Sequence, residues 1–321
     1  MYSKKQISNF AFRQGSRGNQ GFLHLLGSGS ALPTNDNFST SQILEIRGKQ
    51  YMIDCGEGAQ IRIKQMGLRT NRLGHVFISH LHGDHCFGLI GLISTFGMMN
   101  RTADLHIHSY RDLEQLLTPL LSYFCSESPF KIIFHPIDPS KHQLIYEDKS
   151  IEVFTIPLKH RVPSCGFLFR EKAKTRHIKR EMIDFYNVPV SQINKLKLGE
   201  DFVTDGGETI PNDIFTTPPS PPFSYAYCSD TAYCEDIIPI IRNVDVLYHE
   251  ATFADDELLR AQQTMHSTAR QAAEIAKKAE VGVLIIGHYS ARYRNKEVFL
   301  NEATAVFEHT ILSCDKMTLE F

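Results

Sequence analysis

Short apolar runs rich in β-branched and aromatic residues recur along this chain of 321 residues, and several of them end in polar, ligand-type side chains. They predict strands at 22–26, 43–46, 51–53, 76–79, 105–108, 131–134, 151–156, 225–228, 244–248, 281–286 and 317–321. Helical periodicity is clearest at 58–66, 112–121, 267–279 and 296–307. A strand-rich start followed by strand and helix alternation predicts an α/β fold, with sheets packed face to face and helices outside.

Composition excludes several other classes of protein. The chain is 42% hydrophobic and 22% charged, as in ordinary globular proteins, so neither global disorder nor a fibrous rod fits. The formal net charge is only -2, and any nucleic-acid footprint must therefore be local. The longest apolar stretch, 89–99, is interrupted by Gly91 and Gly97 and is shorter than the roughly 20 residues that span a bilayer. We therefore expect no transmembrane helix.

Cysteine usage indicates a reducing compartment. The seven cysteines are odd in number and scattered, and no pair has C-x-x-C spacing, which disfavours both structural thiolate zinc and a secreted disulfide framework. We expect a cytoplasmic protein. Residues 1–21 carry basic side chains but no acid and no apolar signal core, so we predict a disordered basic tail, with an organellar transit peptide as the alternative. Residues 22–321 would form one large folded domain.

Residues 170–198 contain eight Lys and Arg against three Asp and Glu, a local excess of five positive charges. Farther along, T-T-P-P-S-P-P at 216–222 reads as a stiff polyproline-like connector that returns the chain to the core. Together they predict a protruding arm inserted at 170–208, where something negative docks. A solvated charged hairpin is the alternative.

The segment S-H-L-H-G-D-H at 79–85 follows the apolar run 76–78 directly. It places His80, His82, Asp84 and His85 within six residues at a predicted strand end. Imidazole nitrogen and carboxylate oxygen without thiolate suit zinc or another borderline divalent ion in a catalytic site. Gly83 allows a tight turn, so that the two pairs of side chains face two neighbouring points, and this geometry suggests two metals.

A dinuclear site needs further ligands, and later strand ends offer His160, Asp230 and His288. With five His and two Asp, each ion would have three protein ligands and one shared carboxylate. Open positions would remain for a bridging hydroxide and a substrate oxygen. The pattern therefore predicts a catalytic rather than a structural centre.

These residues resemble the metallo-β-lactamase fold superfamily, whose signature is H-x-H-x-D-H followed by separate His, Asp and His ligands. The resemblance runs from about Leu25 to the C-terminus and implies a four-layer αββα sandwich. Within that superfamily, further segments resemble the short form of the ribonuclease Z family, whose members are tRNA 3′-processing endonucleases. The segments that carry this resemblance are L-G-S-G-S-A-L-P-T (26–34), D-C-G-E-G-A-Q (54–60), H-E-A-T-F (249–253), H-S-T (266–268) and H-Y-S-A-R-Y (288–293).

The resemblance implies two Zn²⁺ per subunit. His80, His82 and His160 would hold one zinc, Asp84, His85 and His288 the other, and Asp230 would bridge them. It also implies cleavage of the 3′ trailer from precursor tRNA by a metal-activated hydroxide, leaving a 3′-hydroxyl on the tRNA and a 5′-phosphate on the trailer. Asp84 would accept the proton of the attacking water, and His266, oriented by Glu250, would protonate the leaving oxygen. The likeness of short family members to half of a functional unit implies a homodimer.

The expected arm would bind the tRNA backbone through Lys172, Lys174, Lys179 and Arg180. The family's arm carries Gly-Pro, whereas this chain has Val188, Pro189 and Val190 there. Arg292 would either contact RNA phosphate or support the last loop. Two alternatives remain. One is another dinuclear hydrolase of this fold, a cyclic-nucleotide phosphodiesterase or thioesterase, and the other is a non-catalytic RNA-binding relative.

Overall fold

The computed structural model describes residues 21–34 and 37–321, and the expected basic tail at 1–21 therefore lies, except for Gly21, outside the described residues. The described chain forms two compact units. The first comprises the residues up to Arg170 together with Ser224–Phe321, and the second is Glu171–Phe223. No helix among the described residues is long and apolar enough to cross a membrane.

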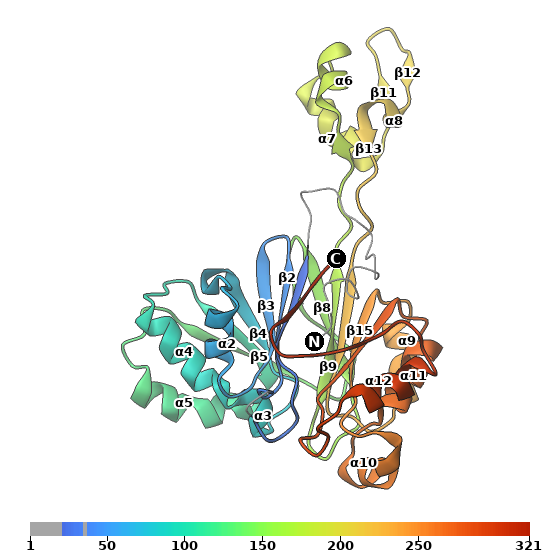
Figure 1. The fold of residues 1–321 in the computed structure, drawn as a ribbon. Coiled ribbons are helices and arrows are strands. Elements are labelled where there is room, and N and C mark those ends of the chain that lie inside the picture. The colour runs from blue at the N-terminus through green and yellow to red at the C-terminus, as the bar shows by residue number, and fades with distance from the viewer. Residues whose placement is uncertain (1–20, 35–36) are drawn as a thin grey trace. The chain divides into compact units, whose positions relative to one another are not determined.

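Two seven-stranded sheets form the centre of the first unit (Figure 1). The first sheet has the order β18-β1-β2-β3-β4-β5-β6. Its strands are β1 (Phe22–Gly27), β2 (Ser41–Ile46), β3 (Lys49–Cys55), β4 (Leu73–Phe77), β5 (Leu105–Tyr110), β6 (Ile132–Ile137) and β18 (Met317–Glu320). Pairing is antiparallel from β18 to β3 and parallel from β3 to β6.

The second sheet has the order β17-β16-β15-β14-β9-β8-β7. Its strands are β7 (Leu144–Glu147), β8 (Ile151–Pro157), β9 (Cys165–Glu171), β14 (Ser224–Cys228), β15 (Val246–Glu250), β16 (Val283–Gly287) and β17 (Thr310–Leu312). Strands β14 to β17 run parallel, so their carboxyl ends lie at the same edge of the sheet.

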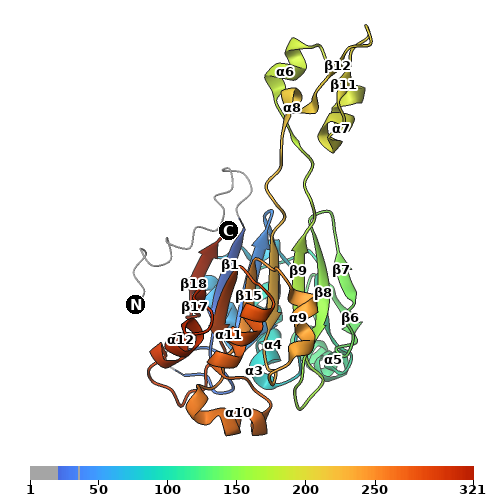
Figure 2. The same cartoon turned by 90° about the vertical axis from the view of Figure 1, so that its right-hand side faces the viewer.

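Helices cover the outer faces of both sheets, as the two orthogonal views show (Figures 1 and 2). On the first sheet lie α2 (Ala59–Gln65), α4 (Gly88–Met98) and α5 (Asp112–Phe124), and on the second α9 (Ile238–Ile241), α11 (Ala269–Lys278) and α12 (Glu297–Thr304). Shorter helices are η1 (Thr70–Arg72), α3 (Gly83–Cys86), η2 (Glu235–Ile237), η3 (Asp255–Glu257) and α10 (Leu258–Thr264). The predicted αββα sandwich is confirmed.

Aromatic side chains fill the space between the two sheets. The ring centroid of Phe77 on β4 lies 5.5 Å from that of Phe167 and 5.4 Å from that of Phe169, both on β9. Because side chains alternate along a strand, the opposite faces of β4 and β9 pack against the outer helices instead. This double burial explains why the strands read as nearly continuous apolar runs in the sequence.

Several elements have no clear signature in the sequence. Helix α4 reads there only as an apolar stretch, because its glycines weaken a helical interpretation. The structure explains Gly88, where a Cβ atom would lie 2.1 Å from the carbonyl oxygen of Gly56, so the helix start packs directly on the backbone after β3. The apolar pattern does not predict strands β7, β9 and β17 either.

The second unit contains β10 (His177–Ile178), α6 (Arg180–Phe185), α7 (Val190–Leu198), β11 (Phe202–Val203), β12 (Thr209–Ile210), α8 (Asn212–Phe215) and β13 (Thr216–Thr217). Its small core is formed by Ile183, Val188, Leu196, Phe202, Ile210 and Phe215. The unit extends past residue 208, the expected end of the arm, and the connector expected at 216–222 begins within it as β13.

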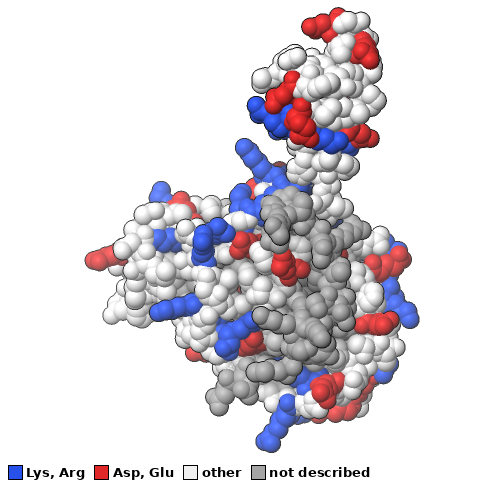
Figure 3. All heavy atoms as spheres, turned by 45° about the horizontal axis from the view of Figure 1, so that its top comes forward, with Lys and Arg blue, Asp and Glu red and all other residues white. Residues whose placement is uncertain are grey.

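This extension changes the charge of the second unit. Residues 171–223 contain seven Lys and Arg against eight Asp and Glu, because five of the acids lie at 200–213. Blue and red side chains accordingly lie side by side on this unit (Figure 3). The excess of five positive charges belongs to the 170–198 segment alone.

Candidate metal centre

Four chain segments bring the seven candidate ligands together in the first unit. The loop after β4 carries His80 and His82, and α3 carries Asp84 and His85. His160 follows β8, Asp230 follows β14, and His288 follows β16. All seven therefore lie just past the carboxyl end of a strand, where open sheets commonly place ligand sites.

Three histidines form the first group around one oxygen of Asp230. His80 Nε2 lies 3.0 Å from His82 Nδ1, which lies 3.4 Å from His160 Nε2. The Oδ2 atom of Asp230 is 3.4 Å from His80 Nε2 and 3.7 Å from His160 Nε2. One potential ligand atom from each of these four residues lies within 4.8 Å of the others.

The other oxygen of Asp230 faces a second group. Asp230 Oδ1 is 2.9 Å from His288 Nε2 and 3.3 Å from His85 Nε2. Both nitrogens also approach Asp84 Oδ2, at 3.6 Å for His288 and 3.5 Å for His85. Asp230 thus presents one oxygen to each group, the arrangement expected of a carboxylate shared between two cations.

The chemistry of the donors fits zinc. The Nε2 atoms of His85 and His288 are buried and face the Asp230 and Asp84 carboxylates without well-aligned hydrogen bonds, which leaves them available to a cation. Five imidazoles and two carboxylates are the ligand types of catalytic zinc centres. The separations of these donor atoms also match bonds of about 2.0 to 2.2 Å to a common ion.

Electrostatics keeps the carboxylates ionised. Burial disfavours the charged form of Asp230, but His288, His85 and His80 around it hold its carboxyl pKa well below the usual value. For His288, burial favours the neutral ring, and the nearby Asp230 carboxylate outweighs it, raising the His288 pKa to about 10. Burial lowers the pKa of His80. A bound cation would take the place of the proton on a charged ring such as that of His288.

Asp54, at the end of β3, forms hydrogen bonds that hold the loop after β4 in place. Its carboxylate accepts hydrogen bonds from Ser79 N–H at 2.8 Å and from the Tyr227 hydroxyl at 2.7 Å, and lies 2.7 Å from His85 Nδ1. Because the Nδ1 atom of His85 is engaged in this way, its Nε2 atom is directed at the centre. Asp54 has a left-handed backbone, with φ of 55°, that points its side chain into this network.

Glu250 and His266 form a pair beside the ligands. Fully buried Glu250 has its Oε1 atom 2.8 Å from His266 Nδ1. Burial favours neutral His266, but the Glu250 carboxylate outweighs it, and the His266 pKa lies above its ordinary value. The other oxygen of Glu250 accepts a hydrogen bond of 2.6 Å from Thr252, whose hydroxyl is 3.0 Å from His288 Nδ1.

Sequence reasoning assigns no role to Asp54 or Thr252. Asp54 opens the D-C-G-E-G-A-Q segment and Thr252 lies in H-E-A-T-F, two of the segments that carry the family resemblance. That resemblance is the only signal for them in the sequence, because neither residue has ligand-type spacing. Their contacts with the ligand histidines emerge only once the strands are assembled.

Most of the expected RNA-binding residues have partners within the protein. In the second unit, Lys174 pairs with Glu171 at 2.9 Å and Arg180 with Asp184 at 3.5 Å. The ammonium group of Lys179 donates to the carbonyl of Asp213 at 2.6 Å. In the first unit, Arg292 is 3.9 Å from Glu257. Lys172, the remaining expected RNA-binding residue, also lies in the second unit.

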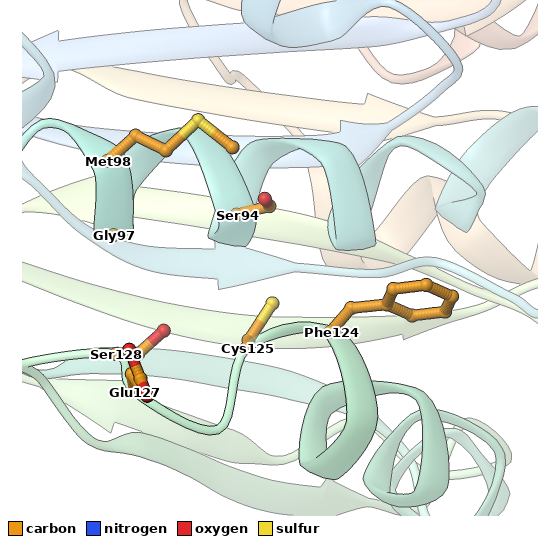
Figure 4. Close-up of a pocket in the computed structure, with 7 residues that line it drawn as sticks. All are labelled: Ser94, Gly97, Met98, Phe124, Cys125, Glu127 and Ser128. Atoms are coloured by element: carbon orange, nitrogen blue, oxygen red, sulfur yellow. The ribbon is translucent and has the colours of Figure 1, made fainter.

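A separate hollow of about 250 Å³ lies between α4 and the end of α5 (Figure 4). Its wall includes Met98, Phe124 and Cys125, with Glu127 as the one carboxylate. This hollow has none of the histidines of the metal centre. Ser94 and Ser128 also line it, so the hollow has both polar and apolar walls and lies apart from the metal centre.

The two-layered sheet core with this cluster at its strand ends defines a protein of the metallo-β-lactamase fold. A model described as "Beta-lactamase superfamily domain" matches residues 219–289, and one described as "Anti-Pycsar protein Apyc1" matches residues 22–178. The structure of human tRNase Z, short form, has a TM-score of 0.67 and 21% identity, and the match covers 92% of this chain and 98% of that one.

Sequence relatives give the particular family. The chain is 56% identical to ribonuclease Z of Bacteroides thetaiotaomicron, with 92% of this chain and 94% of the relative covered. It is 49% identical to ribonuclease Z of Porphyromonas gingivalis, with 93% and 98% covered. This chain belongs to the ribonuclease Z family.

Proposed function

We propose that this protein is a zinc-dependent endoribonuclease that removes the 3′ trailer from precursor tRNA. Membership of the ribonuclease Z family gives the class, a hydrolytic endoribonuclease of tRNA 3′ processing. The observation that carries the chemistry is the position of Asp230 between two groups of ligands, with one oxygen facing each. In this proposal His80, His82 and His160 would hold one zinc, Asp84, His85 and His288 would hold the other, and Asp230 would be shared by both.

When bound, two zinc ions would supply positive charge to the phosphoryl oxygens and lower the pKa of the attacking water, so no side-chain nucleophile would be needed. Asp84 accepts the proton of the attacking water. Its Oδ2 atom accepts a hydrogen bond of 2.8 Å from the Ala31 N–H, which fixes the carboxylate in place. The water oxygen bonds to phosphorus as the bond from phosphorus to the 3′ oxygen breaks, so the trailer keeps a 5′-phosphate.

His266 supplies the proton that the departing 3′ oxygen needs, which leaves a 3′-hydroxyl on the tRNA. Glu250 supports this role in two ways. The 2.8 Å contact orients the ring through Nδ1, so that Nε2 is the atom available to the substrate, and the carboxylate favours the protonated imidazole. In this scheme Glu250 is a positioning residue.

The second unit provides the proposed contact with the tRNA backbone, through Lys172, Lys174, Lys179 and Arg180, with Arg292 of the first unit as a further phosphate contact. The nearly balanced charge of residues 171–223 makes this a local contact rather than a general attraction. The other hydrolases of this fold considered above are less favoured, because the high-identity relatives are ribonucleases Z. A non-catalytic relative is disfavoured by the presence of all seven ligand-type residues.

A homodimer in the cytoplasm completes the proposal. The long-form ribonuclease Z of yeast shares this fold at a TM-score of 0.65, and the match covers 96% of this chain but only 42% of that one. In the proposed dimer, two copies of this chain stand where that longer protein has one chain. Exposed Met98 on α4 and Phe124 on α5, 81% and 62% accessible, give an apolar face for it. Free cysteines are consistent with a reducing compartment.

The direct test is incubation of the zinc-loaded protein with a precursor tRNA, with and without a chelator. We expect one cut just past the acceptor stem, with a 3′-hydroxyl on the tRNA, and complete loss of cleavage after chelation. Cleavage that persists without metal, or zinc-loaded protein that hydrolyses only cyclic nucleotides or thioesters, would refute the proposal.

A further inference from the structure

Asp315 is a buried carboxylate outside the set of candidate ligands. It lies in the turn between β17 and β18, and its side chain is only 6% exposed. Four donors surround it: Oδ1 accepts from Ser28 N–H at 3.0 Å and Ser28 hydroxyl at 2.9 Å, and Oδ2 accepts from Phe38 N–H at 2.8 Å and Arg62 at 2.8 Å. Three of the four donors belong to the loop after β1.

These bonds fix both sides of that loop. Ser28 stands at its start and Phe38 near its end, and the N–H of Gly29 donates to the carbonyl of Phe38 at 3.0 Å. The Arg62 guanidinium, which carries the charge opposite Asp315, also lies 3.8 Å from the centre of the Phe38 ring. Asp315 and Arg62 therefore hold the base of the loop between β18 and α2.

The loop in turn contacts one residue of a candidate metal position, Asp84, and the residue that follows another, His288. Ala31 N–H donates to Asp84 Oδ2 at 2.8 Å, from a left-handed backbone with φ of 52°, a strained conformation that needs external support. Ser30 N–H donates to the carbonyl of Tyr289 at 3.1 Å, and Tyr289 N–H donates to the carbonyl of Ser28 at 3.1 Å. Tyr289 directly follows His288.

We infer that Asp315 is a positioning residue that sets the geometry of the Asp84, His85 and His288 metal position by fixing the loop that contacts Asp84 and flanks His288. The inference rests on the proposed metal centre. In the part of the chain that the structure describes, the side chains of the His80, His82 and His160 group form no hydrogen bond with this loop, so the effect of Asp315 is confined to one of the two positions. A general structural role would instead weaken both positions alike.

The test is zinc titration of metal-free protein against a chromophoric chelator, for the wild type and Asp315→Asn. Asparagine keeps the size of the side chain. It replaces Oδ1 or Oδ2, which accepts hydrogen bonds in the wild type, by an amide N–H₂ group that can only donate them. We expect one of the two binding steps to weaken about tenfold, as for other residues that orient metal ligands, and the other to stay unchanged. Crystals grown with one zinc per chain should then show the ion at the His80, His82 and His160 position.

Asp148→Asn is the matched control. Asp148 is a partly buried carboxylate of the same unit that accepts hydrogen bonds from Tyr51, Ser150 and Ile151, residues outside the metal centre. This substitution should destabilise the fold without changing either zinc affinity. If Asp315→Asn does not fold, Ser28→Ala removes one of the four donors and should weaken the same step to a smaller degree.

Unchanged affinities in Asp315→Asn, or equal weakening of both steps, would overturn the inference and leave the proposed function intact. A loss in Asp148→Asn that matches the loss in Asp315→Asn would overturn it as well. Wild-type protein that takes up no zinc would instead refute the metal centre itself, and the inference with it. The titration does not involve RNA, so a failure of substrate binding cannot be mistaken for either result.

Discussion

Glu250 and His266 lie 2.8 Å apart, the carboxylate fully buried and the imidazole partly open to solvent. If His266 is the proton donor, His266→Ala should lower turnover by about a hundred- to ten-thousand-fold. The zinc content should stay at two per chain, which metal analysis of the purified variant can measure. Zinc loss would instead make His266 a ligand, since one of its ring nitrogens lies within 4.8 Å of potential ligand atoms of Asp230 and His288.

Glu250→Gln tests the other half of the pair. The amide keeps a hydrogen bond to His266 but removes the charge that favours protonated imidazole. We expect kcat to fall about tenfold or more while KM for precursor tRNA stays near the wild-type value, because the change affects the transition state rather than binding. An unchanged kcat would remove Glu250 from the account of catalysis.

The second unit can be tested by salt dependence. Replacing Lys172, Lys174, Lys179 and Arg180 by alanine should raise KM for precursor tRNA and flatten its dependence on salt, since fewer counterions are released on binding. Hydrolysis of a small phosphodiester serves as the control and should not change. If KM and its salt slope match the wild type, these four residues do not bind the RNA.

A cluster of four histidines between the sheets predicts a pH-dependent stability. His75 Nδ1 lies 3.2 Å from His108 Nε2, and His106 Nδ1 lies 2.8 Å from His135 Nε2. Burial, followed by the neighbouring histidines, lowers the pKa of His75 to about 4 and that of His108 to about 2. Tyr146 and Tyr51, and more distantly Asp148 and Lys49, are further titratable groups around His75.

The direction in which stability changes with pH follows from proton uptake on unfolding. Below about pH 6.5 the unfolded chain protonates His75 and His108. The folded protein does not do so until the lower values are reached, so stability falls as the pH drops from 6.5 towards 4. His108→Gln should make this fall less steep, by up to about 1.4 kcal/mol per pH unit. Urea unfolding of metal-free protein between pH 7 and 4.5 measures it, and equal slopes for both proteins would contradict the prediction.

The proposed dimer face gives a further prediction. Met98→Glu places a charge on the most exposed apolar residue of α4, and we expect it to shift the protein from dimer to monomer in sedimentation experiments. Lys64→Glu on α2, an exposed position outside this face, is the matched control. Wild-type protein that sediments as a monomer at micromolar concentration would refute the dimer.

The αββα sandwich and the candidate ligands can be predicted from the sequence because both depend on local patterns. The ligand-type residues lie directly after apolar runs, so His80, Asp230 and His288 stand out from the order of residue types alone. Burial on both sides also makes strands such as β16 conspicuous. The same reasoning misses α4, whose glycines are needed for close backbone packing rather than for breaking a helix.

The residues that support the candidate ligands cannot be identified from sequence patterns. Asp315 and Ser28 are 287 positions apart, and no spacing rule connects them. In the sequence nothing distinguishes Asp54 from the other aspartates. Only the assembled strands β3, β4 and β14 bring Ser79 and Tyr227 into contact with it. The second unit shows a related limit, because the acids at 200–213 that balance its charge follow the basic segment and belong to it only after folding.

The most direct measurement for the central claim is a crystal structure of zinc-loaded protein with anomalous scattering recorded at the zinc edge. We expect two peaks on either side of Asp230. One should lie about 2.0 to 2.2 Å from nitrogens of His80, His82 and His160, and the other at similar distances from Asp84, His85 and His288. A single peak, or peaks away from Asp230, would contradict the two-metal centre on which the proposed function rests.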